Sequence, residues 1–476
     1  MMHINDTVRN RNQSQALQGA EAGLKTSVSI ERGLRLDPLS IFYSLREQFP
    51  GESFLLESVE GTRKTARYSF IGVDPMTVFK ARRDLVDIDG ETRRTEDPYG
   101  SLREYFTSID CGASDVAPFS GGMVGYVGYG VVRHFEGIKE PESVDGNQPD
   151  LYFVVPRHLV CVDHLNSQTL VISHGDIAEI KDALGRAKAA PELDLSIGEG
   201  KPNTTKAEYM EMVDRARESI MDGEIFQVVL SRRTDFGVRG DSLEMYRALR
   251  QLNPSPYMFY LDYGQVQLLG SSPEMLVRLE GSKLTTRPLA GTRPRSPDPE
   301  EDEKLKLEML LDEKERAEHL MLVDLHRNDM GRVSKFGSVK VNELMAVEKY
   351  SHVQHIVSNV ESEIAEDKDA FDALRSSFPA GTVTGAPKVR AMQIISDLEK
   401  SPRGPYGGAV GYFDFTGNMD MAITIRSITV SGTNASVQAG AGIVADSVPE
   451  REFTETEHKM GAMLLAIDSA GRGARR

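Results

Sequence analysis

The sequence is poor in cysteine, in long apolar runs and in net positive charge, and each shortage excludes a class of protein. Only two cysteines occur in 476 residues, Cys111 and Cys161, and they form no CxxC motif. A disulfide framework is therefore excluded, and a reducing cytoplasm is the expected location. No run reaches the roughly 18 apolar residues that a membrane-spanning helix needs. Lys and Arg number 56 against 72 Asp and Glu, and the net charge of −16 disfavours binding to nucleic acids.

The size and composition of the chain fit two or three domains, or one large interwoven domain. Apolar residues make up 39% of the sequence, which is enough for a sizeable core. Residues 1–25 are polar and lack the apolar segment of a signal peptide, so we expect a disordered tail. A stretch at 191–204 contains proline and glycine and is the best linker candidate. We therefore expect one region at 26–200 and another at 201–470.

Predicted strands come in hairpin-like pairs, whereas predicted long helices come in blocks. Thr205 and Glu208 form a capping-box signature at the start of one helix, and another helix is expected near 177–190. One long charged helix is expected over 298–328, and a last helix over 452–470. This arrangement favours an α+β fold with antiparallel sheets over a doubly wound parallel fold.

Two glycine-containing stretches imitate nucleotide-binding motifs. "GAGIVA" at 440–445 matches G-x-G-x-x-A, but four residues, Asp446 to Pro449, separate it from the next helix. A dinucleotide fold starts the helix at once, so a tight turn or a backbone cradle for a carboxylate fits better. "GTVTGAPK" at 381–388 has the wrong spacing for a phosphate loop. Its Pro387 suits the first turn of a helix, whose N-terminus could bind an anion.

Two glutamate pairs share the same helical spacing. Glu315 and Glu318 lie at i and i+3, and an apolar run follows them. Glu452 and Glu455 repeat this spacing near the C-terminus, with Lys459 one turn further. Carboxylates at this spacing usually face solvent. The apolar run, however, places Glu318 near the core boundary, where two acidic pairs would repel each other unless a cation lay between them. Oxygen ligands without Cys or His favour Mg²⁺.

Ten motifs give the sequence a family resemblance. They cover residues 205–465 densely and in order, with looser matches at "FLLES" and "GYVGYGVVRHFE". The sequence resembles the chorismate-utilising enzymes, and within them the large, aminating subunit of anthranilate synthase. The motifs are "GEIFQVVLSRR", "NPSPYMFY", "GSSPEML", "RPLAGTR", "AEHLMLVDLHRND", "YSHVQHIVS", "GTVTGAPK", "YGGAVGYF", "AITIRS" and "AGAGIVADSVPEREFTETEHK".

The resemblance implies a fold, an activity and a partner. The implied fold is a layered sandwich of antiparallel sheets and helices, in which a catalytic region at 201–470 is interwoven with a regulatory region at 26–200. The implied reaction converts chorismate and ammonia to anthranilate and pyruvate, the first committed step of tryptophan biosynthesis. Neither cysteine lies in a glutaminase nucleophile elbow, so a separate glutamine amidotransferase subunit is expected to supply the ammonia. The resulting hetero-oligomer is expected to be a heterotetramer.

The resemblance also assigns roles to individual residues. Glu318 and Glu455 match direct Mg²⁺ ligands, and Glu315 and Glu452 match residues that support the bound waters. Glu274 matches the general acid that protonates the leaving C4 hydroxyl. The other catalytic positions are His355 and Thr382. The matching substrate-binding positions are Gly291, Thr292, Tyr406, Arg426, Gly440, Ala441, Gly442, Lys459 and Gln227.

Two positions choose among the relatives by the nucleophile that attacks chorismate. Isochorismate and salicylate synthases place a lysine where Gln227 stands, and a lysine can act as a base towards water. Glutamine cannot act as a base towards water, which argues for ammonia as the nucleophile. Aminodeoxychorismate synthase carries a nucleophilic lysine where Ala290 stands, so direct attack by ammonia at C2 is expected. That synthase remains the alternative activity.

The regulatory reading also follows from the resemblance. "LLES" and "NPSPYMF" match the tryptophan feedback site of anthranilate synthase, although "NPSPY" would equally suit a loop after a helix. A non-catalytic sensor of chorismate or tryptophan on the same fold is a further alternative. The predicted contacts of inhibitory tryptophan are Leu56, Glu57, Ser58, Pro256, Tyr257 and Met258.

Overall fold

The computed structural model describes residues 25–32, 36–58, 67–112, 116–139, 148–350 and 353–473. The predicted disordered tail at 1–25 lies outside these residues, apart from its last position. The described chain alternates short helices with many strands, and every strand pairing in it is antiparallel. The prediction of an α+β fold with antiparallel sheets is therefore confirmed.

The part of the chain up to residue 202 is dominated by strands, two of which are unusually long. Its helices are α2 (Pro38–Gln48), α3 (Pro98–Ser108), η1 (Tyr129–Val131), α4 (Val132–Glu136) and α5 (Ile177–Gly185). Its strands are β1 (Ser27–Arg32), β2 (Ser53–Glu57), β3 (Tyr68–Arg82), β4 (Leu85–Ile88), β5 (Glu91–Arg94), β6 (Gly122–Val127), β7 (Leu151–Asp163), β8 (Gln168–Ser173), β9 (Leu195–Ile197) and β10 (Lys201–Pro202).

The later part of the chain carries the longer helices. These are α6 (Lys206–Met221), α7 (Leu243–Leu252), α8 (Pro299–Leu311), α9 (Glu313–Gly331), α10 (Ala370–Ser377), η2 (Gly381–Val383), α11 (Lys388–Leu398) and α12 (Pro449–Gly473). The strands are β11 (Gln227–Gly240), β12 (Tyr257–Tyr263), β13 (Val266–Ser272), β14 (Met275–Glu280), β15 (Lys283–Thr286), β16 (Leu289–Pro294), β17 (Lys340–Lys349), β18 (Val353–Glu363), β19 (Gly385–Ala386), β20 (Ala409–Asp414), β21 (Met419–Ile423), β22 (Ser427–Ser431) and β23 (Asn434–Ile443).

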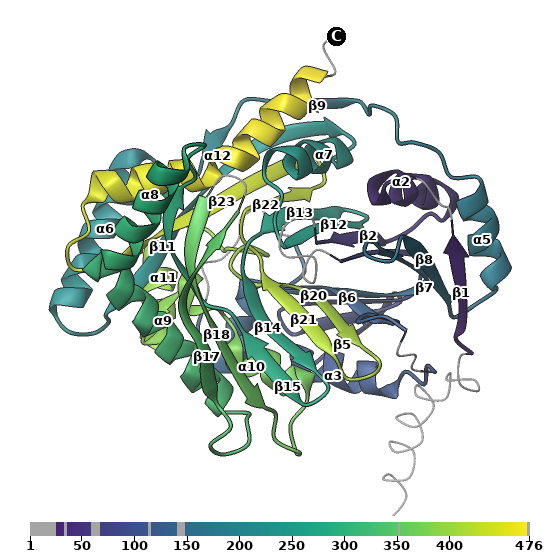
Figure 1. The fold of residues 1–476 in the computed structure, drawn as a ribbon, viewed down its shortest axis with the longest axis horizontal. Coiled ribbons are helices and arrows are strands. Elements are labelled where there is room, and N and C mark those ends of the chain that lie inside the picture. The colour runs from purple at the N-terminus through teal and green to yellow at the C-terminus, as the bar shows by residue number, and fades with distance from the viewer. Residues whose placement is uncertain are drawn as a thin grey trace, which may run out of the picture.

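The strands form one continuous antiparallel sheet, which turns at β7 into two facing sheets built from both parts of the sequence. One runs β7–β3–β2–β12–β13–β22–β23–β11, and the other runs β7–β6–β20–β21–β14–β15–β18. The early strands β2 and β6 thus pair directly with β12 and β20, from much later in the chain. Figure 1 shows these differently coloured strands side by side at the centre of the molecule.

Three hydrophobic clusters form layers between and outside the sheets, and a fourth lies under α6 and α11. Apolar side chains from β2, β3, β6, β7, β12, β13 and β20, such as Phe54, Phe259 and Val410, fill the space between the two sheets. A second cluster packs α2, α5, α7 and α12 on the outer face of the first sheet, and a third packs α3, α9 and α10 on the second. Burial on both faces makes the sheets the rigid frame on which loop residues are held.

Local sequence signals account for several helix boundaries. The capping box predicted at α6 is present: the Thr205 hydroxyl accepts from the Glu208 N–H at 3.3 Å, and the Glu208 carboxylate accepts from the Thr205 N–H at 2.9 Å. Two N–H groups at the start of α6, which have no helical carbonyl to donate to, therefore donate to side-chain oxygens instead. The predicted last helix exists as α12, which begins three residues earlier than expected.

Three elements of the structure differ in extent or type from the sequence-based expectations. The single helix expected over 298–328 is broken at Asp312, whose backbone is extended (ψ 112°) and whose carboxylate accepts from the first amides of α9. The linker expected at 191–204 instead contributes β9 and β10, which pair with β11. The helix near 177–190 ends at Gly185. Asp312 matters most, because its cap starts α9 just before Glu315.

A candidate active site at the strand ends

Three strands of the second sheet end at one edge, and each leads into a predicted site residue. Tyr406 precedes β20, Arg426 follows β21, and Glu274 precedes β14. Because neighbouring strands are antiparallel, these ends meet at the same edge of the sheet (Figure 1). The Ile423 N–H donates to the Glu274 carbonyl at 3.0 Å, which fixes the end of β21 against the start of β14. The fold thus brings residues about 130 to 150 positions apart into one place.

Glu274 is a buried carboxyl group with few partners. Only 4% of the residue is exposed, the Thr382 hydroxyl donates to Oε2 at 3.3 Å, and Oε1 has no hydrogen-bond partner among the described residues. Burial raises the pKa of Glu274 to about 8, against the weaker opposing effects of Thr382 and Arg426. The carboxyl group is therefore mostly protonated at neutral pH and can donate a proton.

Arg426 supplies positive charge beside this acid. Its backbone lies in the left-handed region (φ 48°), and its side chain makes no hydrogen bond or ion pair with any described residue. Burial lowers the pKa of Arg426, and the Glu274 carboxyl group opposes that effect. A half-buried guanidinium without a partner is suited to binding a carboxylate of a ligand.

A β-bulge shapes the wall of the site around His355. The register of β16 against β18 shifts between Ala290 and Arg293, and the extra residues are Gly291 and Thr292. Gly291 has φ +61°, which a side chain would strain, and a Cβ there would lie 3.3 Å from Glu315 Oε2. The bulge turns the Gly291 carbonyl and the Thr292 hydroxyl towards His355.

His355 is buried, and its protonation is defined by these contacts. Its Nδ1 lies 2.9 Å from the Gly291 carbonyl and 3.1 Å from the Thr292 hydroxyl. Since a carbonyl can only accept, Nδ1 carries the hydrogen and Nε2 is left as an acceptor. Burial lowers the pKa of His355 to about 4, so the ring is neutral at physiological pH.

The glycine-rich end of β23 lies against Gln227 and Glu318. The Gln227 Nε2 donates to Glu318 Oε1 at 3.2 Å, and a Cβ at Gly442 would lie only 2.5 Å from that nitrogen. A Cβ at Gly440 would lie 3.2 Å from the Tyr406 hydroxyl. Both glycines therefore leave space at the site that a side chain would occupy. Ala441 differs, because its methyl group belongs to the core under α6 and α11.

The four glutamates predicted to hold a metal lie on α9 and α12. Burial raises the pKa of Glu318, and the neighbouring carboxylates of Glu315 and Glu455 raise it further. Burial likewise raises the pKa of Glu452, and Glu455 adds to that effect. Glu318 thus lies near enough to Glu315 and Glu455 to be repelled by them, and Glu452 lies near enough to Glu455; a bound cation would relieve this repulsion.

Each carboxylate nevertheless has a partner of its own in this structure. Glu315 Oε1 accepts a hydrogen bond from Arg293 Nη1 at 3.1 Å. Glu455 lies 2.7 Å from the Lys459 ammonium, which also donates to the Gly440 carbonyl at 3.0 Å. Among the residues that the structure describes, no three acidic, histidine or cysteine side chains converge as a ready metal centre. The donor set fits Mg²⁺, whose site would form when these side chains turn towards the ion.

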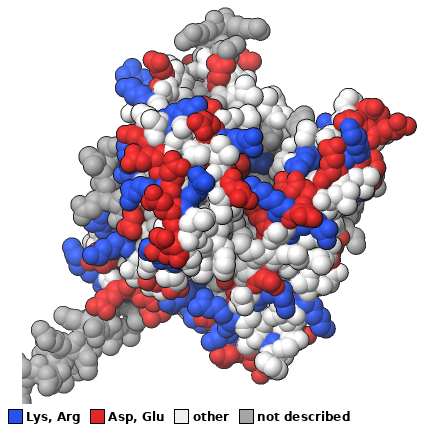
Figure 2. Space-filling view, turned by 90° about the vertical axis from the view of Figure 1, so that its left-hand side faces the viewer, with Lys and Arg blue, Asp and Glu red and all other residues white. Residues whose placement is uncertain are grey.

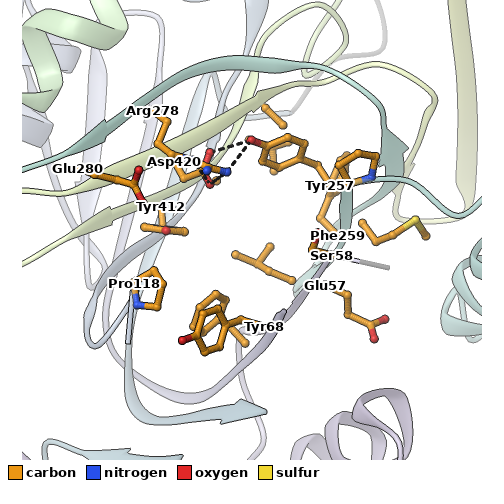
Figure 3. Close-up of a pocket in the computed structure, with 17 residues that line it drawn as sticks. Glu57, Ser58, Tyr68, Pro118, Tyr257, Phe259, Arg278, Glu280, Tyr412 and Asp420 are labelled. Atoms are coloured by element: carbon orange, nitrogen blue, oxygen red, sulfur yellow. Dashed lines mark hydrogen bonds and ion pairs between the residues drawn. The ribbon is translucent and has the colours of Figure 1, made fainter. Parts of the chain in front are cut away.

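A second pocket holds all six residues predicted to contact tryptophan. It encloses about 880 Å³ of empty space, part of it open to solvent, and lies between β2 and β12 on one side and β20 and β21 on the other (Figure 3). Tyr257 donates to Asp420 at 3.1 Å and accepts from Arg278 at 3.0 Å, which closes one end. The carboxylate of Glu57 instead points away from the pocket and binds Arg250 and Tyr246.

Sequence reasoning did not assign eleven of the seventeen residues that line this pocket. The additional lining residues, which the sequence analysis did not assign to this pocket, are Tyr68, Phe70, Pro118, Phe259, Arg278, Glu280, Val410, Gly411, Tyr412, Asp420 and Ala422. Their strands meet only in the folded chain, so no local pattern groups them.

The outer surface fits the expected charge balance. Figure 2 shows the face on the side of α6, α8 and α9, where acidic and basic side chains are interspersed rather than collected into one basic tract. Such a described face offers no continuous path for a phosphate backbone. None of the helices in the described ranges combines the length and the apolar composition needed to cross a bilayer.

Comparisons with known proteins agree with this site. The model of the family described as chorismate binding enzyme matches residues 51–465, so the chain belongs to the chorismate binding enzymes. Within that family it is 45% identical to anthranilate synthase component 1 of Methanothermobacter thermautotrophicus, over 92% of this chain and 93% of the relative. It is 46% identical to the protein of the same name from Acetivibrio thermocellus, over 91% and 93% of the two chains.

Solved structures share the fold. The crystal structure of anthranilate synthase component I from Streptococcus pneumoniae has a TM-score of 0.77 and 38% identity, covering 84% of this chain and 92% of that one. The menaquinone-specific isochorismate synthase from Escherichia coli has a TM-score of 0.72 at 21% identity, covering 97% and 99%, and supports the fold alone. The layered α+β architecture and membership of the chorismate-using, anthranilate synthase type of enzyme are thereby confirmed.

Proposed function

We propose that this chain is the aminating subunit of an anthranilate synthase, which converts chorismate and ammonia to anthranilate, pyruvate and water. The observation that carries the proposal is the buried acid Glu274 at the strand ends that also present Arg426 and Tyr406. A protonated carboxyl group can give its proton to a departing hydroxyl, and an unpaired guanidinium can hold a carboxylate of the substrate.

The reaction divides into two steps that the side chains can serve. In the first, ammonia nitrogen bonds to C2, the ring double bond shifts, and the C4 hydroxyl leaves as water with the proton of Glu274. In the second, the C2 proton is removed and the C3–oxygen bond breaks, which releases pyruvate and makes the ring aromatic. The neutral His355 presents Nε2 as an acceptor and is placed to receive that proton or to orient the substrate.

Ammonia rather than water is the nucleophile favoured by the residues at the start of β11 and in β16. Gln227 occupies the position at which water-using relatives carry a lysine, and its amide donates to Glu318 instead. Ala290 is buried against Ile356 and offers no amine that could attack the ring. Neither side chain can deprotonate water or form a covalent adduct, so free ammonia is the nucleophile that attacks the chorismate ring.

A magnesium ion completes the proposed chemistry. Glu318 and Glu455 would hold it, while Glu315 and Glu452 would order its waters. When bound, the ion neutralises the ring carboxylate and draws electrons as the hydroxyl departs. The mutual repulsion of these carboxylates supports the assignment.

A separate glutamine amidotransferase subunit is proposed as the physiological source of ammonia, in a heterotetramer. The names of the relatives, which specify a component 1, support a second component. Size-exclusion chromatography of the chain with a candidate glutaminase subunit tests this. Co-elution together with glutamine-dependent turnover supports it, and separate elution with turnover from ammonium alone contradicts it.

Tryptophan is proposed as the feedback inhibitor that occupies the second pocket, with region 26–200 as the regulatory part. Strands β14, β20 and β21 support this, because each lines the pocket and each has one end within three residues of Glu274, Tyr406 or Arg426. Pocket residue Ala422 pairs with Met275, directly after Glu274. A ligand that displaced these strands would move the acid and two substrate contacts together.

The activity itself is tested by a product assay. Purified chain with chorismate, Mg²⁺ and ammonium at high pH should yield fluorescent anthranilate and an equal amount of pyruvate. Formation of 4-amino-4-deoxychorismate or isochorismate would refute the proposal, since each corresponds to a different nucleophile or to an arrested reaction.

A further inference from the structure

A buried ion pair lies behind the site, outside the residues that the motifs assigned. Arg403 and Glu399 expose only 1% and 5% of their side chains. The guanidinium donates through Nε to Glu399 Oε2 at 2.9 Å and through Nη2 to Oε1 at 2.6 Å. Burying two charges costs solvation free energy, and the attraction between the charges often does no more than offset this cost. Such a pair is therefore weak evidence of a purely stabilising role.

The same guanidinium holds the backbone of two segments that carry site residues. Arg403 Nη1 donates to the Val383 carbonyl at 2.6 Å, and Nη2 donates to the Val229 carbonyl at 2.7 Å. Val383 directly follows Thr382, whose hydroxyl reaches Glu274. Val229 lies two residues beyond Gln227 on β11. One planar cation thus binds the segment that contacts the acid and the segment that begins with Gln227.

Tyr406 also lies next to Arg403. The Tyr406 N–H donates to the Arg403 carbonyl at 3.3 Å, which closes the turn before β20. The guanidinium carbon lies 5.8 Å from the centroid of the Tyr406 ring and 4.7 Å from that of Tyr129. The cation is therefore flanked by two aromatic rings, one of which is a predicted substrate contact.

Glu399 extends the same connections to a further strand pair. Its Oε1 accepts from the Ser231 N–H at 2.7 Å and from the Ser231 hydroxyl at 2.8 Å. Gln438 of β23 donates to that hydroxyl at 2.8 Å. The pair therefore joins α11, β11, β23, η2 and the turn before β20.

We propose that Arg403 is a positioning residue for the amination reaction: its fixed fork of donors sets the place of Thr382 through the Val383 carbonyl, and its guanidinium packs beside the Tyr406 ring. This role rests on the proposed function. Lysine cannot replace it, because an ammonium is a point charge with three donors and lacks the planar fork that reaches Glu399 and two carbonyl groups at once. Loss of the fork would displace Thr382 from Glu274 and loosen the Tyr406 ring.

Arg403→Lys, compared with Arg46→Lys, separates positioning from stability. Arg46 is also an arginine paired with carboxylates, Asp241 and Asp262, and exposes only 9% of its side chain, but it lies on α2 and contacts no predicted site residue. We expect urea unfolding to show a loss of stability in both variants. With saturating ammonia, kcat of Arg403→Lys should fall on the order of ten- to a hundredfold with a smaller change in KM for chorismate, whereas Arg46→Lys keeps its kcat.

Two further measurements show whether Arg403 acts through Thr382. Because the Thr382 hydrogen bond favours ionised Glu274, Arg403→Lys should shift the high-pH limb of kcat upward, as Thr382→Val does. The double variant should lose less activity than the product of the single effects. Glu399→Gln keeps an acceptor for the arginine and provides a milder version should Arg403→Lys not fold; it should show the same direction.

The outcomes separate this role from the proposed function. No anthranilate from the wild-type chain overturns the proposed function and the positioning role with it. An active wild type, together with unchanged kcat in Arg403→Lys and Glu399→Gln, overturns the positioning role alone. Equal losses in the Arg46 and Arg403 variants, or fully multiplicative effects with Thr382→Val, would reduce the pair to a stabilising contact.

Discussion

Replacing Glu274 with glutamine should change both the stability of the folded chain and its catalytic activity. Glutamine keeps the size and hydrogen-bonding capacity of a protonated carboxyl group but cannot ionise. The side chain is buried, with one oxygen unpartnered among the described residues, so the folded chain resists placing a negative charge there. The variant should therefore be more stable than the wild type above neutral pH and yet inactive.

The magnitude follows from the difference between the folded and unfolded pKa values. Burial raises the pKa of Glu274 from 4.5 to about 8. Between these values the folded chain holds a proton that the unfolded chain has lost, so stability falls as pH rises through this window. The full loss, reached above the folded pKa, is about 5 kcal/mol at 1.36 kcal/mol per pKa unit, and it is about 3 kcal/mol at pH 7.

Urea unfolding at several pH values between about 5 and 9 measures this directly. Glu274→Gln should lack the decline that the wild type shows across the window, and its turnover should be abolished. Glu457→Gln is a suitable control, because that carboxylate is exposed and lies off the predicted metal face. Equal pH dependence in wild type and Glu274→Gln would refute the claim that a buried carboxyl group titrates there. Retained turnover would refute its role as the acid.

Three further predictions concern the metal, the inhibitor and the nucleophile. Glu318→Gln should lower Mg²⁺-dependent turnover at least ~100-fold while circular dichroism shows a folded chain, and unchanged activity would exclude it as a ligand. The sequence contains no tryptophan, so a change in the fluorescence of added tryptophan reports its binding to the second pocket. Ser58→Phe should fill the pocket and abolish this change. It should also raise the half-inhibitory concentration of tryptophan at least ~10-fold while turnover is retained. Inhibition that survives in this variant would place the site elsewhere. Gln227→Lys should reduce ammonia-dependent anthranilate formation ~10-fold or more and give isochorismate on chromatography, and an unchanged product would contradict the role assigned to Gln227.

The fold class could be predicted because its signals are local. Paired strand patterns and the Thr205 capping box depend on residues a few positions apart, and they indicated antiparallel sheets and the start of α6. The break at Asp312 could not be found in the same way, since a charged helix continues on either side of it and an aspartate in a helix is unremarkable. Only its extended backbone reveals that it caps α9.

The motifs could predict individual residues of the candidate site but not how the fold brings them together. The resemblance indicated Glu274 and Arg426 separately, but their meeting at one sheet edge depends on the pairing of β14 with β21. Arg403 gave no sequence signal, because its role depends on the carbonyl groups of Val229 and Val383, which carry no side-chain identity. Glu57 shows the opposite limit, since its motif position was indicated while its carboxylate is engaged with Arg250.

The most direct test of the central claim is the identity of the product formed from chorismate and isotopically labelled ammonium. Purified chain with Mg²⁺ and ¹⁵N-ammonium, analysed by mass spectrometry, should give anthranilate that carries one ¹⁵N atom, together with one equivalent of pyruvate. Unlabelled isochorismate, or labelled 4-amino-4-deoxychorismate without pyruvate, would contradict attack by ammonia at C2 and the roles of the residues around it.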